Sequence, residues 1–400
     1  MRVLVFLLVS GVAHFLAARW LLSTLSPATR LRRSRVIVLT AAALSLLLAT
    51  ARLLAVTFET PTMRTFVAVC MLELGAVVIA LLPIGLMTLV TRGVSRVLAA
   101  KQPVPADVTP PLVDVVPAAI VSRRQAIERV FGVTIFGATT SALGWGMVRG
   151  RHAFALEEVV VRVKNWPRAL EGYTIAQVSD VHVGTFVGDR ELDEGFELVT
   201  RIRPDMVVAT GDLVDFDSTT VGALALRLLR ANARDGAFAI LGNHDHYAGA
   251  ADVVQRLRSM NVNVLSNQSM RLRPGDGGGF ALLGVDDMQG RSGHSPGFGG
   301  PDLYAAERGL DVEVPRILLA HQPRYFKEAA GRIALQLSGH THGGQINPGF
   351  RPAELVMDFV AGRYERAGST LWVNRGFGVA GPPSRVGAPP EVTKIVIVAA

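Results

Sequence analysis

The sequence contains a single cysteine, Cys70, so no disulfide within the chain can hold its fold together. A chain of 400 residues can bury a large core without such links, so this absence does not indicate a cellular compartment. The sequence also lacks internal repeats and long low-complexity tracts. Charged residues make up only 18% of the chain and hydrophobic residues 50%, a proportion that is high for a purely soluble enzyme.

Acidic residues are scarce in the first 150 residues. This part carries 15 Lys and Arg but only 5 Asp and Glu, a net charge of +10, whereas residues 151–400 carry 26 and 28, a net charge of −2. The positive charge therefore belongs to arginines that flank hydrophobic runs, and not to the surface of a folded domain. This distribution gives no reason to expect nucleic acid as a partner, and it disfavours a nuclease.

Three long hydrophobic runs occupy residues 3–22, 36–58 and 65–90. Each is long enough for a transmembrane helix, which needs about 20 apolar residues. We therefore assign residues 1–101 to a transmembrane region of three helices. A further run, which is uncharged over residues 130–148 and rich in Gly, Thr and Ser, predicts a fourth transmembrane helix over residues 130–150. An interfacial or linker helix is the alternative for this last run.

Residues 102–129 are interpreted as a linker, because their first part contains five prolines and such a density disfavours helix. The segment Ser122-Arg123-Arg124-Gln125 resembles a twin-arginine export signal. Ala126 stands where that signal usually has a bulky aromatic residue. The alternative is that these arginines are ordinary positive charges on the cytoplasmic side of the membrane.

Loop charges indicate an orientation. Loops 19–35 and 92–129 are rich in Arg and Lys, whereas loop 59–64 contains one arginine, so the two rich loops should be cytoplasmic. If the fourth helix spans the membrane, residues 155–400 lie on the extracytoplasmic side, although Arg149 and Arg151, just beyond the uncharged run, argue against it. We expect a multi-pass protein of the bacterial inner (cytoplasmic) membrane with an extracytoplasmic soluble domain.

Arg52 and Glu73 are charged residues inside the second and third hydrophobic runs. Charges within a membrane are costly and are usually paired. The two residues should lie at similar depth in an antiparallel helical hairpin, so we expect them to pair. Mutual neutralisation is favoured over a role in transport.

From residue 156 onward, short apolar runs alternate with amphipathic ones. Four amphipathic segments predict helices at 189–201, 221–230, 250–259 and 324–330. The mixture fits one α/β or α+β domain with two stacked sheets. Ten apolar runs predict strands, at 159–163, 174–178, 206–209, 237–241, 262–265, 280–283, 316–320, 333–337, 370–373 and 393–398.

Residues of metal-binding types directly follow five of these strands. Loops at strand ends converge on one edge of a sheet, so two Asp, one Asn and four His could meet there. Nitrogen and oxygen donors without thiolates suit Mn, Fe, Zn or Mg better than a structural cysteine site does. Each segment alone is a weak signal, but five in this order disfavour ordinary polar loops. They are Asp180-Val181-His182, Gly211-Asp212, Gly242-Asn243-His244-Asp245, His321 and Gly339-His340-Thr341-His342.

The series Asp-x-His, Gly-Asp-x-x-Asp, Gly-Asn-His-Asp, His and Gly-His-x-His resembles the calcineurin-like metallophosphoesterase superfamily. The strings at 339–345 and 374–378 look like its membrane-anchored bacterial branch, which includes proteins similar to UDP-2,3-diacylglucosamine pyrophosphohydrolases. The resemblance covers residues 155–400. It implies an α+β fold, a two-sheet αββα sandwich, here preceded by three to four transmembrane helices.

The resemblance also implies a ligand set for two divalent ions, for which Mn, Fe or Zn are favoured over Mg. Asp212 would bridge the two ions, and His244 would lie near the substrate phosphate, oriented by Asp245. Asp215 would support the Asp212 loop. One ion would be held by Asp180, His182, Asp212 and His342, and the other by Asp212, Asn243, His321 and His340.

We therefore expect a membrane-tethered, metal-dependent phosphoric ester hydrolase of the phosphodiesterase or pyrophosphatase type. Its substrate would be a lipid-linked or other envelope phosphoester or pyrophosphate. An extracytoplasmic site disfavours nucleotide-linked lipid A precursors and favours a phospholipid or an undecaprenyl-type phosphate. Arg375 and Arg385 could bind a second phosphate or an anionic head group, or be surface charges, and His246 could extend the site or face solvent. The alternative function is a membrane sensor or transport-associated protein with an accessory metal-binding domain.

Overall fold

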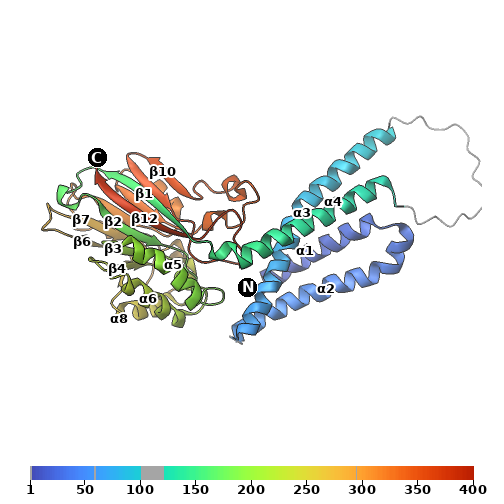
Figure 1. The fold of residues 1–400 in the computed structure, drawn as a ribbon, viewed down its shortest axis with the longest axis horizontal. Coiled ribbons are helices and arrows are strands. Elements are labelled where there is room, and N and C mark those ends of the chain that lie inside the picture. Colours follow the sequence, from blue (N-terminus) through green and yellow to red (C-terminus); the bar gives the residue numbers. More distant parts are fainter. Residues whose placement is uncertain (1, 58–59, 101–120, 294) are drawn as a thin grey trace, which may run out of the picture. The chain divides into compact units, whose positions relative to one another are not determined.

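The computed structural model describes the chain except for residues 1, 58–59, 101–120 and 294 (Figure 1). Within the described helices, the side chains at 2–6, 49, 52–57, 61 and 98–100 are also left out of the description. The chain divides into two compact units, Met1–Gly144 and Trp145–Ala400. Each unit is described separately.

The first unit consists of long helices: α1 (Arg2–Thr24), α2 (Pro27–Thr57), α3 (Pro61–Ala100) and most of α4 (Arg123–Val148). Pro27 and Pro61 stand at the first helical position, where the missing N–H costs no hydrogen bond. Among the described residues, three helical stretches are long and apolar enough to cross a membrane. These stretches are Leu7–Thr24, Thr62–Val97 and Arg123–His152.

These stretches contain most of the first and all of the third and fourth hydrophobic runs predicted as spans. The run at 36–58 forms helix α2, but part of it lies outside the described residues, so its assignment as a span stays a prediction. The side chain of Arg52 is also outside the description, so the predicted pairing of Arg52 with Glu73 is not tested. Glu73 instead contacts His14, with Oε1 3.1 Å from Nε2.

Helix α4 begins at Arg123, earlier than the predicted boundary at residue 130. Ser122 caps it, because the Ser122 hydroxyl accepts the Gln125 N–H at 3.2 Å and the Gln125 side chain accepts the Ser122 N–H at 3.1 Å. The twin-arginine pair therefore lies in the first helical turn. The close approach of Trp20 explains why this helix has glycine at position 132, because a Cβ on Gly132 would lie 2.1 Å from the Trp20 ring.

The second unit contains two six-stranded mixed sheets with helices, which confirms the predicted α+β fold. In the first sheet, β2, β3, β4 and β5 are parallel, and β12 runs antiparallel to β2 and parallel to β1. In order, its strands are β1 (Ala155–Val163), β12 (Glu391–Ala399), β2 (Tyr173–Val178), β3 (Met206–Thr210), β4 (Ala237–Ile240) and β5 (Asn263–Val264).

In the second sheet, β11, β9, β8 and β7 are parallel, and the two edge strands are antiparallel to their neighbours. In order, its strands are β10 (Gly362–Arg366), β11 (Ser369–Val373), β9 (Leu335–Ser338), β8 (Arg316–Leu319), β7 (Phe280–Gly284) and β6 (Gln268–Leu272). The ten predicted strands all form, but the edge strands β6 and β10 were missed. Their side chains are mostly solvent-accessible, so they lack an apolar run.

Apolar side chains from both sheets meet between them, among them Ile175, Phe238 and Phe280, all fully buried. Helices α5 (Asp189–Ile202), α6 (Val221–Arg230) and α8 (Ala250–Ser259) lie along the outer face of the first sheet (Figure 1) and bury a second cluster against it. Short helices α9 (Leu303–Ala306) and α10 (Phe326–Ala329) contribute to a third cluster on the second sheet. Central strands that are covered on both faces have continuous apolar sequences, and the sequence therefore predicted these strands.

Replacement of Phe280 by Ala should destabilise this unit, because the Phe280 ring packs between Trp166 and Tyr173 at 5.0 and 5.1 Å between ring centroids. We expect the free energy of unfolding to fall by about 3–5 kcal/mol, measured by urea unfolding of the full chain in detergent. Phe350→Ala is the matched control, since Phe350 is 60% exposed, and should change it by less than about 0.5 kcal/mol. Equal effects of the two substitutions would contradict the packing described.

Candidate metal centre

Five strands bring the predicted ligands to one end of the two sheets. Strands β2, β3 and β4 of the first sheet and β8 and β9 of the second are parallel within their sheets, so their carboxyl ends lie at common edges. Two hydrogen bonds join these edges across the sheets. The Gln177 amide donates to the Ser338 carbonyl at 3.0 Å, and Nδ1 of His321 donates to the Thr210 carbonyl at 2.8 Å.

The first cluster comprises Asp180, His182 and His342, all buried. The Nε2 atoms of His182 and His342 lie 3.1 Å apart, and Nε2 of His342 lies 3.6 Å from Oδ1 of Asp180. Their ligand atoms all lie within 4.8 Å of one another. One carboxylate and two imidazoles, all three of them predicted ligands, thus lie close enough to hold a metal ion together.

The second cluster comprises Asp212, His321 and His340. Nδ1 of His340 lies 3.2 Å from Nε2 of His321, which is 3.3 Å from Oδ2 of Asp212. The same Asp212 oxygen lies 3.7 Å from Nε2 of His182 in the first cluster. Asp212 therefore stands between the two clusters, where a bridging ligand would stand.

The chemistry of these donors fits divalent cations. Nδ1 of His321 carries a proton, because the Thr210 carbonyl can only accept, and Nε2 faces Oδ2 of Asp212 and Nδ1 of His340. Burial lowers the pKa of His321, but the charge of Asp212 outweighs it and raises this pKa well above its usual range, and a bound cation would replace the proton on Nε2. Oδ1 of Asn243 is buried and has no hydrogen-bond partner among the described residues. These carboxylate, amide and imidazole donors suit a pair of divalent ions.

The backbone at the ligands adopts a conformation that side chains rarely allow. Asp180, His182, Asp212, His340 and His342 all have positive φ, between 50° and 71°. Each such residue costs on the order of 1–2 kcal/mol. Backbone strain of this kind persists where function fixes the direction of a side chain. Here the strained backbone directs the side chains of five ligand candidates toward one small volume.

Glycines next to the ligands are required by the close approach of the ligand carboxylates. A Cβ at Gly242 would lie 2.3 Å from Oδ1 of Asp212, and one at Gly339 would lie 2.1 Å from Oδ2 of Asp180. Gly211 itself has φ of 88°. Any larger residue at Gly242 or Gly339 would displace a carboxylate of the centre.

Burial and charge set the protonation of the cluster. Burial lowers the pKa of His342 well below its usual range, and the nearby His182 and Arg385 lower it further. Burial also lowers the pKa of His182. Burial alone would raise the pKa of Asp212, but His321 outweighs it and holds that pKa well below normal. His182 and His342 are therefore neutral and Asp212 is ionised, which are the forms that bind metals.

His244 lies beside the clusters with its ring 4.5 Å from that of His182. Its Nδ1 lies 3.0 Å from the Asp215 carbonyl and 3.4 Å from Oδ1 of the same residue. Burial lowers the pKa of His244, but the bond to Asp215 and the charge of Asp212 outweigh it and raise the pKa to about 9. His244 thus carries a proton at neutral pH.

The prediction that Asp245 orients His244 is wrong, because the Asp245 carboxylate serves the backbone. It accepts the N–H groups of Leu213, Val214 and Gly242 at 2.9, 3.1 and 2.8 Å. Burial, together with the Asp212 charge, raises the pKa of Asp245 to about 7. Asp245 therefore ties the loop after β3 to the loop after β4, and the residue that holds His244 is Asp215.

The expectation that Arg375 and Arg385 bind a phosphate or are surface charges is also wrong. Arg375 is paired with Glu157 and Glu391, at 2.6 and 3.0 Å. Arg385 is fully buried and donates to backbone carbonyls of residues 375, 376, 378 and 388, while its Nη2 lies 3.1 Å from Nδ1 of His342. Arg385 is thus a support of the His342 ligand, which an isolated arginine in the sequence could not reveal.

His246 neither joins the clusters nor faces solvent. Its ring is buried, with Nε2 2.9 Å from Asp286 and Nδ1 2.9 Å from the Ser295 hydroxyl. Asp287 caps a short helical turn after β7, because its side chain accepts the Gln289 N–H. Two aromatic neighbours of His244 were missed: the rings of Phe216 and Tyr247 lie 5.2 and 5.4 Å from the His244 ring. The sequence signal that could have identified these two aromatic residues is their position, directly after Asp215 and His246 and thus next to the ligand motifs.

Comparisons with known proteins agree with this geometry. Residues 173–344, which contain all seven ligand candidates, match the model of the calcineurin-like phosphoesterase family. The chain is 33% identical over 294 residues to a transmembrane protein with metallophosphoesterase domain from Danio rerio, covering 70% of this chain and 67% of that protein. The protein of the same name from Bos taurus is 32% identical over 289 residues, 70% of this chain and 64% of its own. The chain thus spans about two thirds of these relatives.

A bacterial relative is matched over nearly its whole length. The uncharacterized metallophosphoesterase YkuE of Bacillus subtilis is 30% identical over 282 residues, which cover 68% of this chain and 96% of that protein. The match therefore reaches well beyond the residues of the clusters themselves.

Asp245→Asn should destabilise the loops around the centre, because an amide offers one acceptor oxygen to the three buried N–H groups. We expect the free energy of unfolding to fall by about 1–3 kcal/mol, measured in the presence of a chelator so that metal binding does not contribute. Asp311→Asn is the control, since its carboxylate is 80% exposed and the change should be near zero. An unchanged stability in Asp245→Asn would contradict the tie.

Proposed function

We propose that this chain, which belongs to the calcineurin-like phosphoesterase family and is a hydrolase of phosphoesters, acts on a substrate with a lipid portion and is tethered to a membrane by its N-terminal helices. The observation that carries the lipid part is a loop of exposed apolar side chains beside the candidate metal centre. The tether rests on the apolar helices and on their predicted spans.

Two divalent ions would be held by the two clusters. Asp212 would be shared, since its Oδ2 lies within 3.3 Å of His321 and 3.7 Å of His182. When bound, such ions polarise phosphoryl oxygens and lower the pKa of water. Manganese, iron or zinc suit these donors best, with magnesium as an alternative. One ion would have Asp180, His182, Asp212 and His342 as ligands, and the other Asp212, Asn243, His321 and His340.

His244 would act on the substrate directly. It bears a proton at neutral pH and is held in place by Asp215. From this position it would donate a hydrogen bond to a phosphoryl oxygen and pass its proton to the leaving group. Phe216 and Tyr247 flank the His244 ring and would form an apolar wall against the group attached to the phosphate.

The exposed apolar loop follows the last ligand motif. Phe350, Leu355, Val356 and Met357 are 60, 80, 84 and 43% exposed. The turn η7 (Pro352–Leu355) packs on η6 (His342–Gly344), and a Cβ at Gly344 would lie 3.5 Å from that of Ala353. Adjacent exposed apolar side chains of this kind mark sites that meet lipid or protein. A lipid is favoured, because a membrane tether concentrates the domain at a bilayer.

Hydrolysis of model esters tests the enzymatic part. The full chain in detergent, stripped of metal and then given Mn²⁺, should hydrolyse bis-p-nitrophenyl phosphate or p-nitrophenyl phosphate. Asp212→Ala should abolish turnover because it removes the shared carboxylate, and His244→Ala should lower kcat by about 10²–10⁴-fold. Full activity in both variants would show that hydrolysis takes place elsewhere.

A pair of surface variants tests the lipid part. Phe350→Ser combined with Val356→Ser should lower turnover of phosphatidic acid in mixed micelles by about tenfold or more, and leave p-nitrophenyl ester hydrolysis unchanged. Val312→Ser is the matched control, because Val312 is also 84% exposed but lies in the loop before β8. Parallel loss on both substrates, or equal loss in the control, would count against a lipid-contacting role of this loop.

A further inference from the structure

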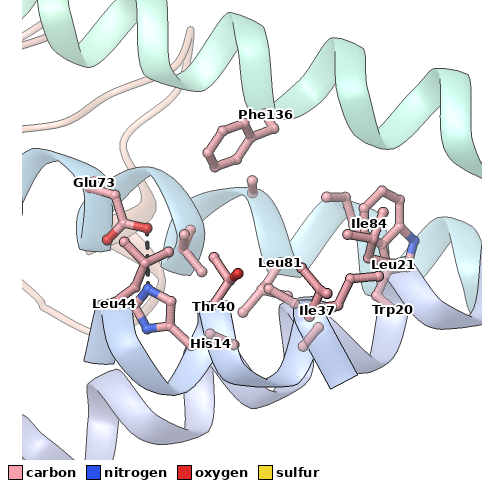
Figure 2. Close-up of a pocket in the computed structure, with 16 residues that line it drawn as sticks. His14, Trp20, Leu21, Ile37, Thr40, Leu44, Glu73, Leu81, Ile84 and Phe136 are labelled. Carbon is pink, nitrogen blue, oxygen red and sulfur yellow. Dashed lines mark hydrogen bonds and ion pairs between the residues drawn. The ribbon is translucent and has the colours of Figure 1, made fainter. Parts of the chain in front are cut away.

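A cavity of about 330 Å³ lies among the helices of the first unit (Figure 2). It is more than twice the volume of about 150 Å³ at which an engineered apolar cavity binds benzene, and it falls within the range of about 300–1,000 Å³ typical of ligand pockets. Its walls come from α1, α2 and α3, with Phe136 of α4 on one side. Nothing in the hydrolytic function uses it.

Small side chains on three helices leave this space open. Ala17 and Ala18 of α1, Ala41 of α2 and Ala80 of α3 line the cavity at positions where larger residues would fill it. Larger apolar side chains surround them, so the walls are almost entirely apolar. Figure 2 shows the two ends: His14 and Glu73 lie at one, and Trp20, Leu21 and Ile84 at the other. The cavity is therefore elongated and polar at one end.

The polar end has a defined hydrogen-bonding character. Nδ1 of His14 lies 2.8 Å from the Ser10 carbonyl, which can only accept, so Nδ1 carries a proton. Nε2 of His14 lies 3.1 Å from Oε1 of Glu73. The pair is then either an imidazolium that donates to a carboxylate, or a neutral imidazole whose Nε2 accepts a hydrogen bond from the protonated Oε1. Oε2 of Glu73 is a hydrogen-bond acceptor in both states.

This oxygen is left unsatisfied. Oε2 of Glu73 is buried and has no hydrogen-bond partner among the described residues. A buried acceptor without a donor costs about 1–3 kcal/mol, and the cost is greater in an apolar environment. A ligand that brings a hydrogen-bond donor to this end, and an apolar chain to the rest of the cavity, would remove the cost.

We propose that this cavity binds a single-chain alkyl amphiphile whose head group donates a hydrogen bond to Glu73 and whose chain extends toward Trp20. The class includes long-chain alcohols and amines. The cavity shares no residue with the metal clusters, so this proposal does not depend on the proposed hydrolytic function.

Fluorescence quenching tests this proposal directly, because Trp20 lines the far end of the cavity. The probe is 12-bromododecan-1-ol, whose hydroxyl would meet Glu73 and whose bromine would lie near Trp20. With the full chain in detergent, we expect a saturable phase of tryptophan quenching that Trp20→Phe removes. Excess dodecan-1-ol should reverse it by competition.

Variants separate the cavity from general partitioning into the detergent. Ala41→Phe should fill the cavity and abolish the saturable phase, whereas Ala42→Phe, at an exposed position next to it that does not line the cavity, should retain it. Ala17→Phe repeats the block from another helix, in case one variant does not fold. Quenching that is non-saturable, or equal in Ala41→Phe and Ala42→Phe, would overturn the site.

The head-group contact has its own test. Glu73→Leu removes the acceptor and should weaken the apparent affinity for 12-bromododecan-1-ol by about tenfold. The probe 12-bromododecane, which lacks a donor, should bind the native chain as weakly as the alcohol binds Glu73→Leu. Equal saturable quenching by both probes in the native chain would overturn recognition by Glu73.

Discussion

The second unit depends on holding seven nitrogen and oxygen donors against one another in a buried volume. Side chains such as His182 and His342, or His321 and His340, place ring nitrogens 3.1–3.2 Å apart. Divalent cations between these donors would be held by carboxylate, amide and imidazole atoms together, which is the arrangement we propose. The fold supplies rigidity, because strands paired within two sheets fix where each loop begins, and the loops have little freedom to relax apart.

Backbone support offsets the strain of this arrangement. Five ligand candidates have positive φ, and the contacts that hold them come from residues that bind no metal. The Asp245 carboxylate accepts hydrogen bonds from three N–H groups of two loops. The Arg385 guanidinium donates to carbonyls of the loop at 375–378 and contacts His342. Both are ionisable groups removed from water, which is tolerable because their hydrogen bonds are largely satisfied.

Buried polar groups also need hydrogen-bond partners in the helical unit, but there one group lacks a partner among the described residues. His14 and Glu73 are polar residues in apolar helices, and they satisfy one another only in part, since one carboxylate oxygen keeps no donor among the described residues. Alanines on three helices leave space next to that oxygen. An unsatisfied acceptor beside an apolar cavity defines the chemistry of a molecule that could occupy it, namely a hydrogen-bond donor attached to an apolar chain.

The sequence by itself determined the ligand candidates, the ten strands with apolar runs, the α+β fold and the apolar helices, because these depend on local patterns: a polar motif directly after a buried strand, or a run without charges. Only the tertiary structure decided which side chains support the ligand candidates through hydrogen bonds and ion pairs. The edge strands β6 and β10 have exposed side chains and no periodic signal, Asp245 and Arg385 act on groups distant in the sequence, and His14 meets Glu73 across 59 residues. Long-range contacts leave no trace in local composition, so a single sequence could not assign these roles.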